Sequence, residues 1–245
     1  SGGSDSDGVY VHRYDAAGNA LAAAQLVNQV TASAQFDPSI AVRGDGSFVV
    51  SWTSQSQDAD GLYGVYARRF DTAGAALDNE VLVNTVETDD QHQSSVATTA
   101  DGGFIVTWTT GAINTNVAGQ RFDAAGARLS GEFTINTNTG GAAYGSSVAV
   151  SAGGQVIVVW ESEPQDGSGA GVYRQRFTLT EGSDRSVSFV EDGGAVLLGD
   201  AYAALGDVDV GHDLEAADDA GLDGPRRAHD LVQHAVDAVA HAQVG

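Results

Sequence analysis

The stretch from Asp45 to Trp52 reads DGSFVVSW, and close copies of it occur twice more, as DGGFIVTW ending at Trp108 and GGQVIVVW ending at Trp160. In the first copy Phe48, Val50 and Trp52 fall on one face of an extended chain, and the residues between them fall on the other. This alternation has a period of two and predicts a strand in each copy. The Asp-Gly or Gly-Gly pair before the strand permits positive φ and indicates a tight hairpin.

The repetition extends beyond this strand. The tryptophans are 56 and 52 residues apart, and the same spacings relate three turns, three asparagines and three serines. In the copy that begins near Ser39, further strands are expected at Val65–Phe70 and Val81–Asn84. Four short antiparallel strands in about fifty residues are the content of one propeller blade. The predicted fold is therefore all-β, a propeller-like array of four-stranded antiparallel blades, with about three repeats of 52–56 residues spanning 9–180.

The two ends of the array are incomplete. The first copy offers only third and fourth strands, and the last lacks a clear fourth strand. Closed propellers usually contain four to eight blades. Either the two ends therefore join in one shared blade, or the chain is a slice of a longer array. The chain contains no methionine, so we expect it to be part of a longer chain.

Three other segments differ from the repeats in composition. Residues 1–8 are acidic and predicted to be flexible. Residues 181–210 form a linker or the truncated start of another module, with one short strand pattern. Residues 211–245 are rich in Ala, Asp and His. Apolar residues at helical spacing there are compatible with a C-terminal helix, and an out-of-frame reading would explain the abrupt loss of strand periodicity equally well.

The composition narrows the classes of partner. All eleven basic residues are arginine, against 33 acidic residues and a formal net charge of −22. A strongly negative field repels nucleic acid, so we expect no nucleic-acid partner. No apolar run approaches the roughly 20 residues that cross a bilayer, so no membrane insertion is expected. The absence of cysteine removes disulfides and thiolate metal sites.

Length differences among the copies fall in one connection, the loop after each tryptophan strand. Insertions confined to one connection lie on one edge of a repeat array, which is often the binding edge, although neutral drift in a solvated loop would give the same pattern. We therefore predict ligand contacts from polar and aromatic residues of these loops, namely Gln57, Tyr63, Asn114, Asn116 and Gln165.

The same loops contain candidate metal ligands. Asp58 and Asp60 are two residues apart before a glycine, and Asp166 lies in the matching loop. Carboxylates so placed suit Ca²⁺, the cofactor that we consider, although acidic turns that cap their own backbone have the same sequence. No complete EF-hand loop is present. The chain also has no nucleophile elbow, Walker loop or zinc-helix spacing, so no catalytic residue is predicted and the chain is not expected to be an enzyme.

The recurring tryptophans and arginines are predicted to be structural. The tryptophans end the most apolar strand of each copy, which favours a place in the core over a sugar-stacking platform. An arginine precedes the aromatic residue of each turn, which favours an ion pair with an acid on a neighbouring strand, such as Glu80 or Glu132. The residues concerned are Trp52, Trp108, Trp160, Arg69, Arg121 and Arg176.

Three longer segments carry a family resemblance. The segments GVYARRFDTAGAAL (64–77), VLVNTVETDDQHQSSVATTADGGFIVTW (81–108) and SEPQDGSGAGVYRQRF (162–177) resemble repeats of large bacterial type I secreted proteins, the RTX-like and calcium-associated adhesins. VSFVEDGGAVLLGDAYAALGDVD (187–209) is similar to the opening of cadherin-like or VCBS-type modules. The resemblance implies an extracellular or cell-surface location, calcium association and a role in adhesion.

The predicted function is therefore a non-enzymatic, secreted bacterial repeat module that presents one loop edge for adhesion or ligand display, to a glycan or a surface protein. A glycan-binding propeller lectin, or the non-catalytic propeller of a secreted hydrolase, is an alternative. A structural spacer without a ligand is a third.

Overall fold

The computed structural model describes residues 7–113, 115–129, 131–163, 170–178, 180–181, 187–188 and 196–197. These residues form strands and turns without a helix, which confirms the prediction of an all-β chain. None of them belongs to a helix of the length and apolarity needed to span a membrane. The predicted tail, 211–245, lies outside the described residues, as do most of 1–8 and of 181–210.

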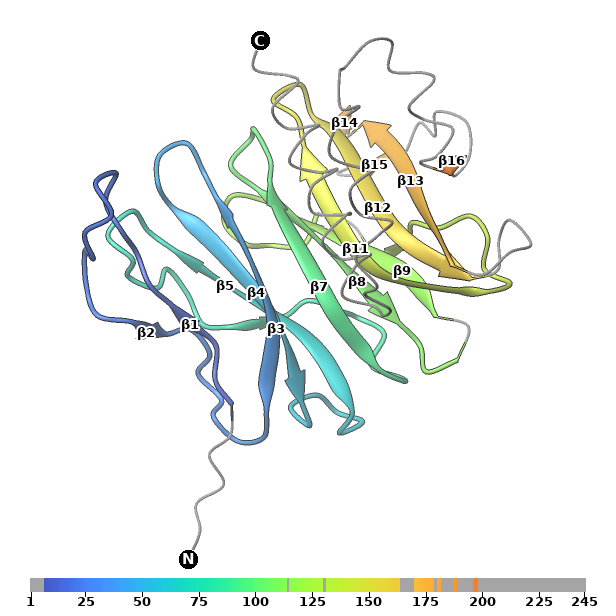
Figure 1. Ribbon diagram of the computed structural model, residues 1–245, viewed down its shortest axis with the longest axis horizontal. Helices are drawn as coiled ribbons and strands as arrows, with labels where there is room; N and C mark the ends of the chain where they lie inside the picture. The colour runs from blue at the N-terminus through green and yellow to red at the C-terminus, as the bar shows by residue number, and fades with distance from the viewer. Residues whose placement is uncertain are drawn as a thin grey trace, which may run out of the picture.

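Three four-stranded antiparallel sheets contain most of the strands (Figure 1). The first has the order β3 (Gln35–Val42), β4 (Phe48–Gln55), β5 (Tyr63–Phe70) and β6 (Val81–Leu82). The second has β7 (Gln91–Thr98), β8 (Phe104–Thr110), β9 (Asn116–Phe122) and β10 (Phe133–Thr134), and the third has β11 (Ala142–Val150), β12 (Gln155–Glu163), β13 (Gly171–Thr178) and β16 (Val196–Leu197). Two-stranded sheets pair β1 (Tyr10–Val11) with β2 (Gln25–Leu26), and β14 (Thr180–Glu181) with β15 (Val187–Ser188).

The strands at the start of the array were predicted from the sequence, whereas the last strand of the third sheet was not. The β1–β2 pair is the third and fourth strand of an incomplete first unit, as expected. The third sheet does have a fourth strand, which the sequence analysis did not find. It is β16, which pairs Leu197 with Tyr173 and Val196 with Arg174. The repeat spacing did not reveal it because Leu197 follows its partner Tyr173 by 24 residues, whereas Leu82 follows Tyr66 by 16.

Tight turns join the first two strands of each sheet. Gly46, Gly102 and Gly154 have φ of +89°, +82° and +79°, the left-handed conformation that the Asp-Gly and Gly-Gly pairs predicted. Within each sheet the register then pairs the tryptophan strand with both of its neighbours.

The sheets lie side by side, and the core lies between them. β7 packs against both β3 and β11, so the first strands of the three sheets are neighbours (Figure 1). Phe48, Val50 and Trp52 pack with residues of the incomplete first unit, whereas Val49 packs with Val106 of the second sheet. The first and second sheets are therefore buried on both faces and share their cores with neighbouring units. On its other face, the third sheet carries a small cluster of its own residues around Val159.

Repeated hydrogen bonds join the first strands of successive sheets. The amide of Val96 donates to Ser39 Oγ at 3.2 Å, and the equivalent amide of Val148 donates to Ser95 Oγ at 3.1 Å. The register of each first strand shifts just before its serine, at the same position in all three sheets. The recurring serines thus bond one unit to the next.

The recurring asparagines close each unit internally. Asn84 accepts a hydrogen bond from the amide of Val65 at 2.9 Å and donates to the carbonyl of Val86 at 3.0 Å. Asn28 and Asn136 make the same pair of bonds in their units. All three asparagines are buried, which explains why their spacing matches that of the tryptophans.

The predicted partners of the arginines were wrong. Arg69 pairs with Asp78 at 2.5 Å, and Arg121 pairs with Asp101 at 2.6 Å. Glu80 instead accepts hydrogen bonds from two backbone amides of the preceding unit, as does Glu132. These acids lie beside amides that have no strand partner, and a carboxylate there satisfies two donors at once.

The arginine side chains also bind the next unit. Arg13 donates to the backbone carbonyls of Thr72 and Ala73, and Arg69 donates to that of Ala124. Both arginines therefore hold the Asp-x-x-Gly turn of the following sheet. Arg176 lies on β13 and is half-buried.

Candidate binding edge

The variable loops and the beginnings of the first strands lie at the same end of the sheets. Antiparallel pairing puts Gln35, the first residue of β3, opposite Ser54, and Gln55, the last residue of β4, opposite Tyr63. The same holds for the other two sheets. We call this end the loop edge; it consists of the loops 56–62 and 111–115 and the first residues of β3, β7 and β11.

The loop at 56–62 holds a carboxylate that is shielded from solvent. Both oxygens of Asp58 are buried and accept no hydrogen bond among the described residues. Its carboxylate lies so close to Gly64 that a Cβ at that position would sit 2.9 Å from Oδ2. Burial, followed by the neighbouring acids Asp60 and Glu87, raises the pKa of Asp58 to about 6.

The predicted polar ligand residues of the loops are bound within the protein. Gln57 accepts a hydrogen bond from Ser54 at 2.6 Å and donates one to Glu80 at 2.7 Å. Asn116 accepts one from Asn136 at 2.9 Å. Both side chains thus hold the loops in place. Three other predicted residues lie outside the described residues, namely Asn114, Gln165 and Asp166.

Tyr63 lies beside an aromatic ring that the sequence analysis missed. Its ring meets Phe36 edge to face, with centroids 5.5 Å apart. Phe36 is the second residue of β3, and the repeat spacings of 56 and 52 residues place His92 on β7 and Tyr144 on β11 at the same position. All three rings are half-buried. Applying the spacings of the tryptophans to every aromatic and histidine residue would have found them.

The backbone sets these rings at the edge in the same way. Each ring precedes a residue in the left-handed conformation, Asp37, Gln93 or Gly145, with φ of 50°, 56° and 63°. The amide of Gln93 donates to Thr53 of the sheet before it, and the amide of Gly145 donates to Thr109, at 3.2 and 3.1 Å. The bulge therefore fixes one ring per sheet in a defined position relative to its neighbour.

The charge around the rings is negative. Burial lowers the pKa of His92, opposed by the nearby charges of Asp90 and Asp37, so the imidazole is neutral at pH 7. The Tyr144 hydroxyl donates to Glu163 at 3.2 Å. Burial, then Glu161 and Glu163, raises the pKa of Tyr144 to about 12. The edge thus presents neutral rings among carboxylates.

A complete cation site is not formed by the part of the chain that the structure describes. No three side chains of the kinds that bind metal ions converge there. Asp58 and Asp60 supply two carboxylates, whereas Ca²⁺ takes six to eight oxygen ligands. Calcium binding at this loop therefore stays a prediction.

The three tryptophans do not reach the loop edge surface. Trp52, Trp108 and Trp160 are fully buried, in three successive layers between sheets. A sugar could not stack on them without unfolding the sheets, so the half-buried rings are the aromatic surface available at this end.

No protein-family profile matches the sequence, and no curated protein matches it. Among solved structures, the chain is similar to an α-L-arabinofuranosidase from Lactobacillus brevis, with 14% identity, coverage of 68% of this chain and 59% of that one, and a TM-score of 0.42. It is also similar to an endo-1,4-β-xylanase from Bacteroides thetaiotaomicron VPI-5482, with 10% identity, coverage of 79% of this chain and 79% of that one, and a TM-score of 0.45. A third similar structure is the Hadza microbial sialidase Hz136, with 9% identity, coverage of 62% of this chain and 36% of that one, and a TM-score of 0.43. At these TM-scores and identities, the matches assign neither a family nor an activity to this chain.

Proposed function

We propose that this chain is a non-enzymatic repeat module that binds a neutral carbohydrate at its loop edge. The observation that carries the proposal is the recurrence of a half-buried ring, at Phe36, His92 and Tyr144, in the same position of three neighbouring sheets. Sugars present apolar C–H faces that stack on such rings and hydroxyls that bond to nearby polar groups. The surrounding carboxylates accept hydrogen bonds from those hydroxyls, and their negative charge repels anionic sugars.

Binding is favoured over catalysis by the way the polar side chains at the edge are used. Gln57 and Asn116 hold loops, and Tyr144 bonds to Glu163. These bonds preorganise a surface, which suits recognition. The location we propose is extracellular or on a bacterial cell surface, within a longer secreted chain, where such a module serves adhesion.

We also infer that the sheets are propeller-like blades. Four short antiparallel strands per unit, first strands that are neighbours, and a core between units all suit that architecture. Among the described residues the sheets form no closed ring, so further units in the longer chain would supply the rest.

The test is a screen of neutral oligosaccharides against the immobilised chain, followed by calorimetric titration of each hit. Each of the substitutions Phe36→Ala, Tyr63→Ala and Tyr144→Ala should raise the Kd about three- to tenfold, the range expected for the loss of one aromatic contact. Tyr14→Ala is the matched control, because Tyr14 is 57% exposed and has the repeat position of Phe70, which lies at the end of β5 away from Tyr63.

Three outcomes would contradict the proposal. The first is binding that Tyr14→Ala weakens as much as the edge substitutions do. The second is an absence of binding to any sugar, which would favour the structural spacer. Release of reducing ends from a bound oligosaccharide would show that the chain is an enzyme and reject its non-enzymatic character.

A further inference from the structure

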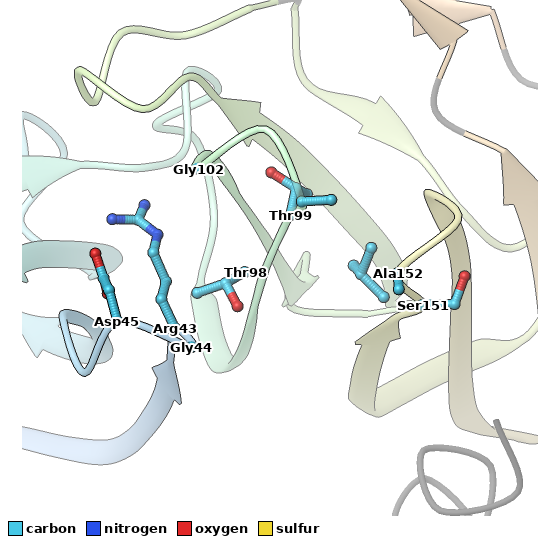
Figure 2. A pocket seen from close by; sticks show the side chains of 10 residues that line it. Arg43, Gly44, Asp45, Thr98, Thr99, Gly102, Ser151 and Ala152 are labelled. Atoms are coloured by element: carbon cyan, nitrogen blue, oxygen red, sulfur yellow. The ribbon is translucent and has the colours of Figure 1, made fainter. Parts of the chain in front are cut away.

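A second concave site lies at the opposite end of the sheets from the loop edge. The hairpins that join β3 to β4, β7 to β8 and β11 to β12 line an open pocket of about 420 Å³ (Figure 2). This volume is within the usual range for small-molecule sites. Because the three hairpins belong to three sheets, the pocket exists only when the sheets are assembled.

Arg43 provides the positive charge of this pocket. Its Nη2 donates a long hydrogen bond, 3.4 Å, to the carbonyl of Gly103, and its Nε is buried with no partner among the described residues. The ion pairs between described residues are Arg69–Asp78 and Arg121–Asp101, so Arg43 takes part in neither. A guanidinium on a pocket wall that joins neither ion pair leaves its Nη donors for a ligand oxygen.

The acids near Arg43 are already bound elsewhere. Asp45 accepts hydrogen bonds from the amide and the hydroxyl of Ser47, at 2.9 and 2.7 Å. Asp101 pairs with Arg121 and accepts the amide of Gly103 at 3.1 Å. Both bonds of Asp45 end on the same oxygen, Oδ1, and neither carboxylate lies within ion-pair distance of Arg43.

The charged form of Arg43 is poorly stabilised by its surroundings. Burial, followed by the positive charge of Arg69, lowers the pKa of Arg43, and the more distant charges of Asp45 and Asp101 oppose this only in part. An anion bound in the pocket would offset both effects. Hydroxyl groups on the pocket wall, from Thr98 and Ser151, could bond to the rest of such a ligand (Figure 2).

We propose that this pocket binds a small ligand that carries one carboxylate, such as a sugar acid. The planar guanidinium of Arg43 matches the geometry of a carboxylate, and its two Nη groups can bond both oxygens. The net charge of −22 repels polyanions, which favours a ligand with a single negative charge. This site is independent of the carbohydrate site proposed at the loop edge.

The test is titration of the full chain with sodium glucuronate and, separately, with glucose, followed by NMR shifts of the pocket amides. Glucuronate should bind with shifts at Thr98 and Ser151, and glucose should not. Arg43→Gln should weaken glucuronate binding about tenfold or more, because a charge-assisted hydrogen bond is lost. Arg128→Gln, which removes an exposed arginine outside the pocket, should leave the affinity unchanged.

A second variant guards against a folding defect in Arg43→Gln. Ala152→Leu keeps the arginine and fills the pocket from the third hairpin, where Ala152 is exposed (Figure 2). It should also abolish glucuronate binding while the melting temperature stays near that of the parent. Equal binding of glucose and glucuronate would overturn the proposal, as would full affinity in either Arg43→Gln or Ala152→Leu. A failure at the loop edge would leave these results untouched.

Discussion

The indole Nε1–H of Trp108 donates a hydrogen bond of 2.9 Å to Oε1 of Gln91, and both residues are fully buried. Trp52 and Gln35 form the same bond at 3.1 Å one unit earlier. In the third unit Ala143 stands at the position of the glutamine, and Nε1 of Trp160 is buried without a partner among the described residues. Three equivalent tryptophans thus differ in whether their one polar atom is satisfied.

This difference predicts unequal costs for one substitution. Trp108→Phe leaves the buried Oε1 of Gln91 without its hydrogen-bond donor, whereas Trp160→Phe removes an N–H that has no partner among the described residues. Both variants lose a similar apolar area, so the free energy of unfolding should fall by about 1–3 kcal/mol more in Trp108→Phe. Urea unfolding of the two proteins under identical conditions measures the difference. Equal losses would mean that the hydrogen bond contributes nothing.

A single unit should not fold alone. The face of Trp52 is covered by Val9 and Val27 of the preceding unit, and Val49 on the other face packs with Val96 and Val106 of the next. Residues 32–86, expressed alone, would expose both faces to water and should be unfolded. Circular dichroism and amide NMR shifts check this, with the full chain as reference. Dispersed amide signals from the fragment would contradict a core shared between sheets.

The buried carboxylate at the loop edge predicts a pH-dependent stability difference. Asp58 has a pKa of about 6 in the folded chain and an ordinary value of 3.8. Since the folded state binds the proton more tightly, the stability from this group is fully present below pH 3.8 and is lost as the pH rises through 6. Asp58→Asn has no charge to bury. Its melting temperature should therefore exceed that of the parent by an amount that is near zero in acid and largest at neutral pH.

Melting curves of both proteins across that range provide the measurement. Taking the difference between them removes the contributions of the other carboxylates. A gain that is independent of pH, or one that is largest in acid, would show that Asp58 is not protonated in the way described.

Calcium binding at Asp58 and Asp60 makes a separate prediction. A ligand that binds only the folded form must stabilise it by mass action. Millimolar CaCl₂ should then raise the melting temperature of the parent, a chelator should reverse the rise, and Asp58→Asn with Asp60→Asn should show neither effect. Magnesium chloride at equal ionic strength is the control. A parent melting point that neither calcium nor chelator moves would remove the cation from this loop.

The strands and their hairpins could be predicted because their signals are local. Phe48, Val50 and Trp52 alternate within one strand, and Asp45-Gly46 supplies the turn beside it, so a few neighbouring residues decide the outcome. The outer strand β16 was not predicted because it lies off the repeat spacing, with Leu197 24 residues after its partner Tyr173 rather than 16. The partner of Arg69 was assigned to Glu80 rather than Asp78 because both acids lie close in the sequence and only side-chain geometry separates them.

The sequence by itself determined that this protein is built from repeated antiparallel strands, since the alternation, the glycine turns and the spacings of 56 and 52 residues are written in it. Only the tertiary structure decided what the units do to one another: that Phe36, His92 and Tyr144 occupy one edge, and that three hairpins enclose Arg43 at the other. The physical reason is distance along the chain. Contacts between neighbouring sheets join residues about fifty positions apart. A pattern of neighbouring residues cannot predict such contacts, because they form only when the sheets pack.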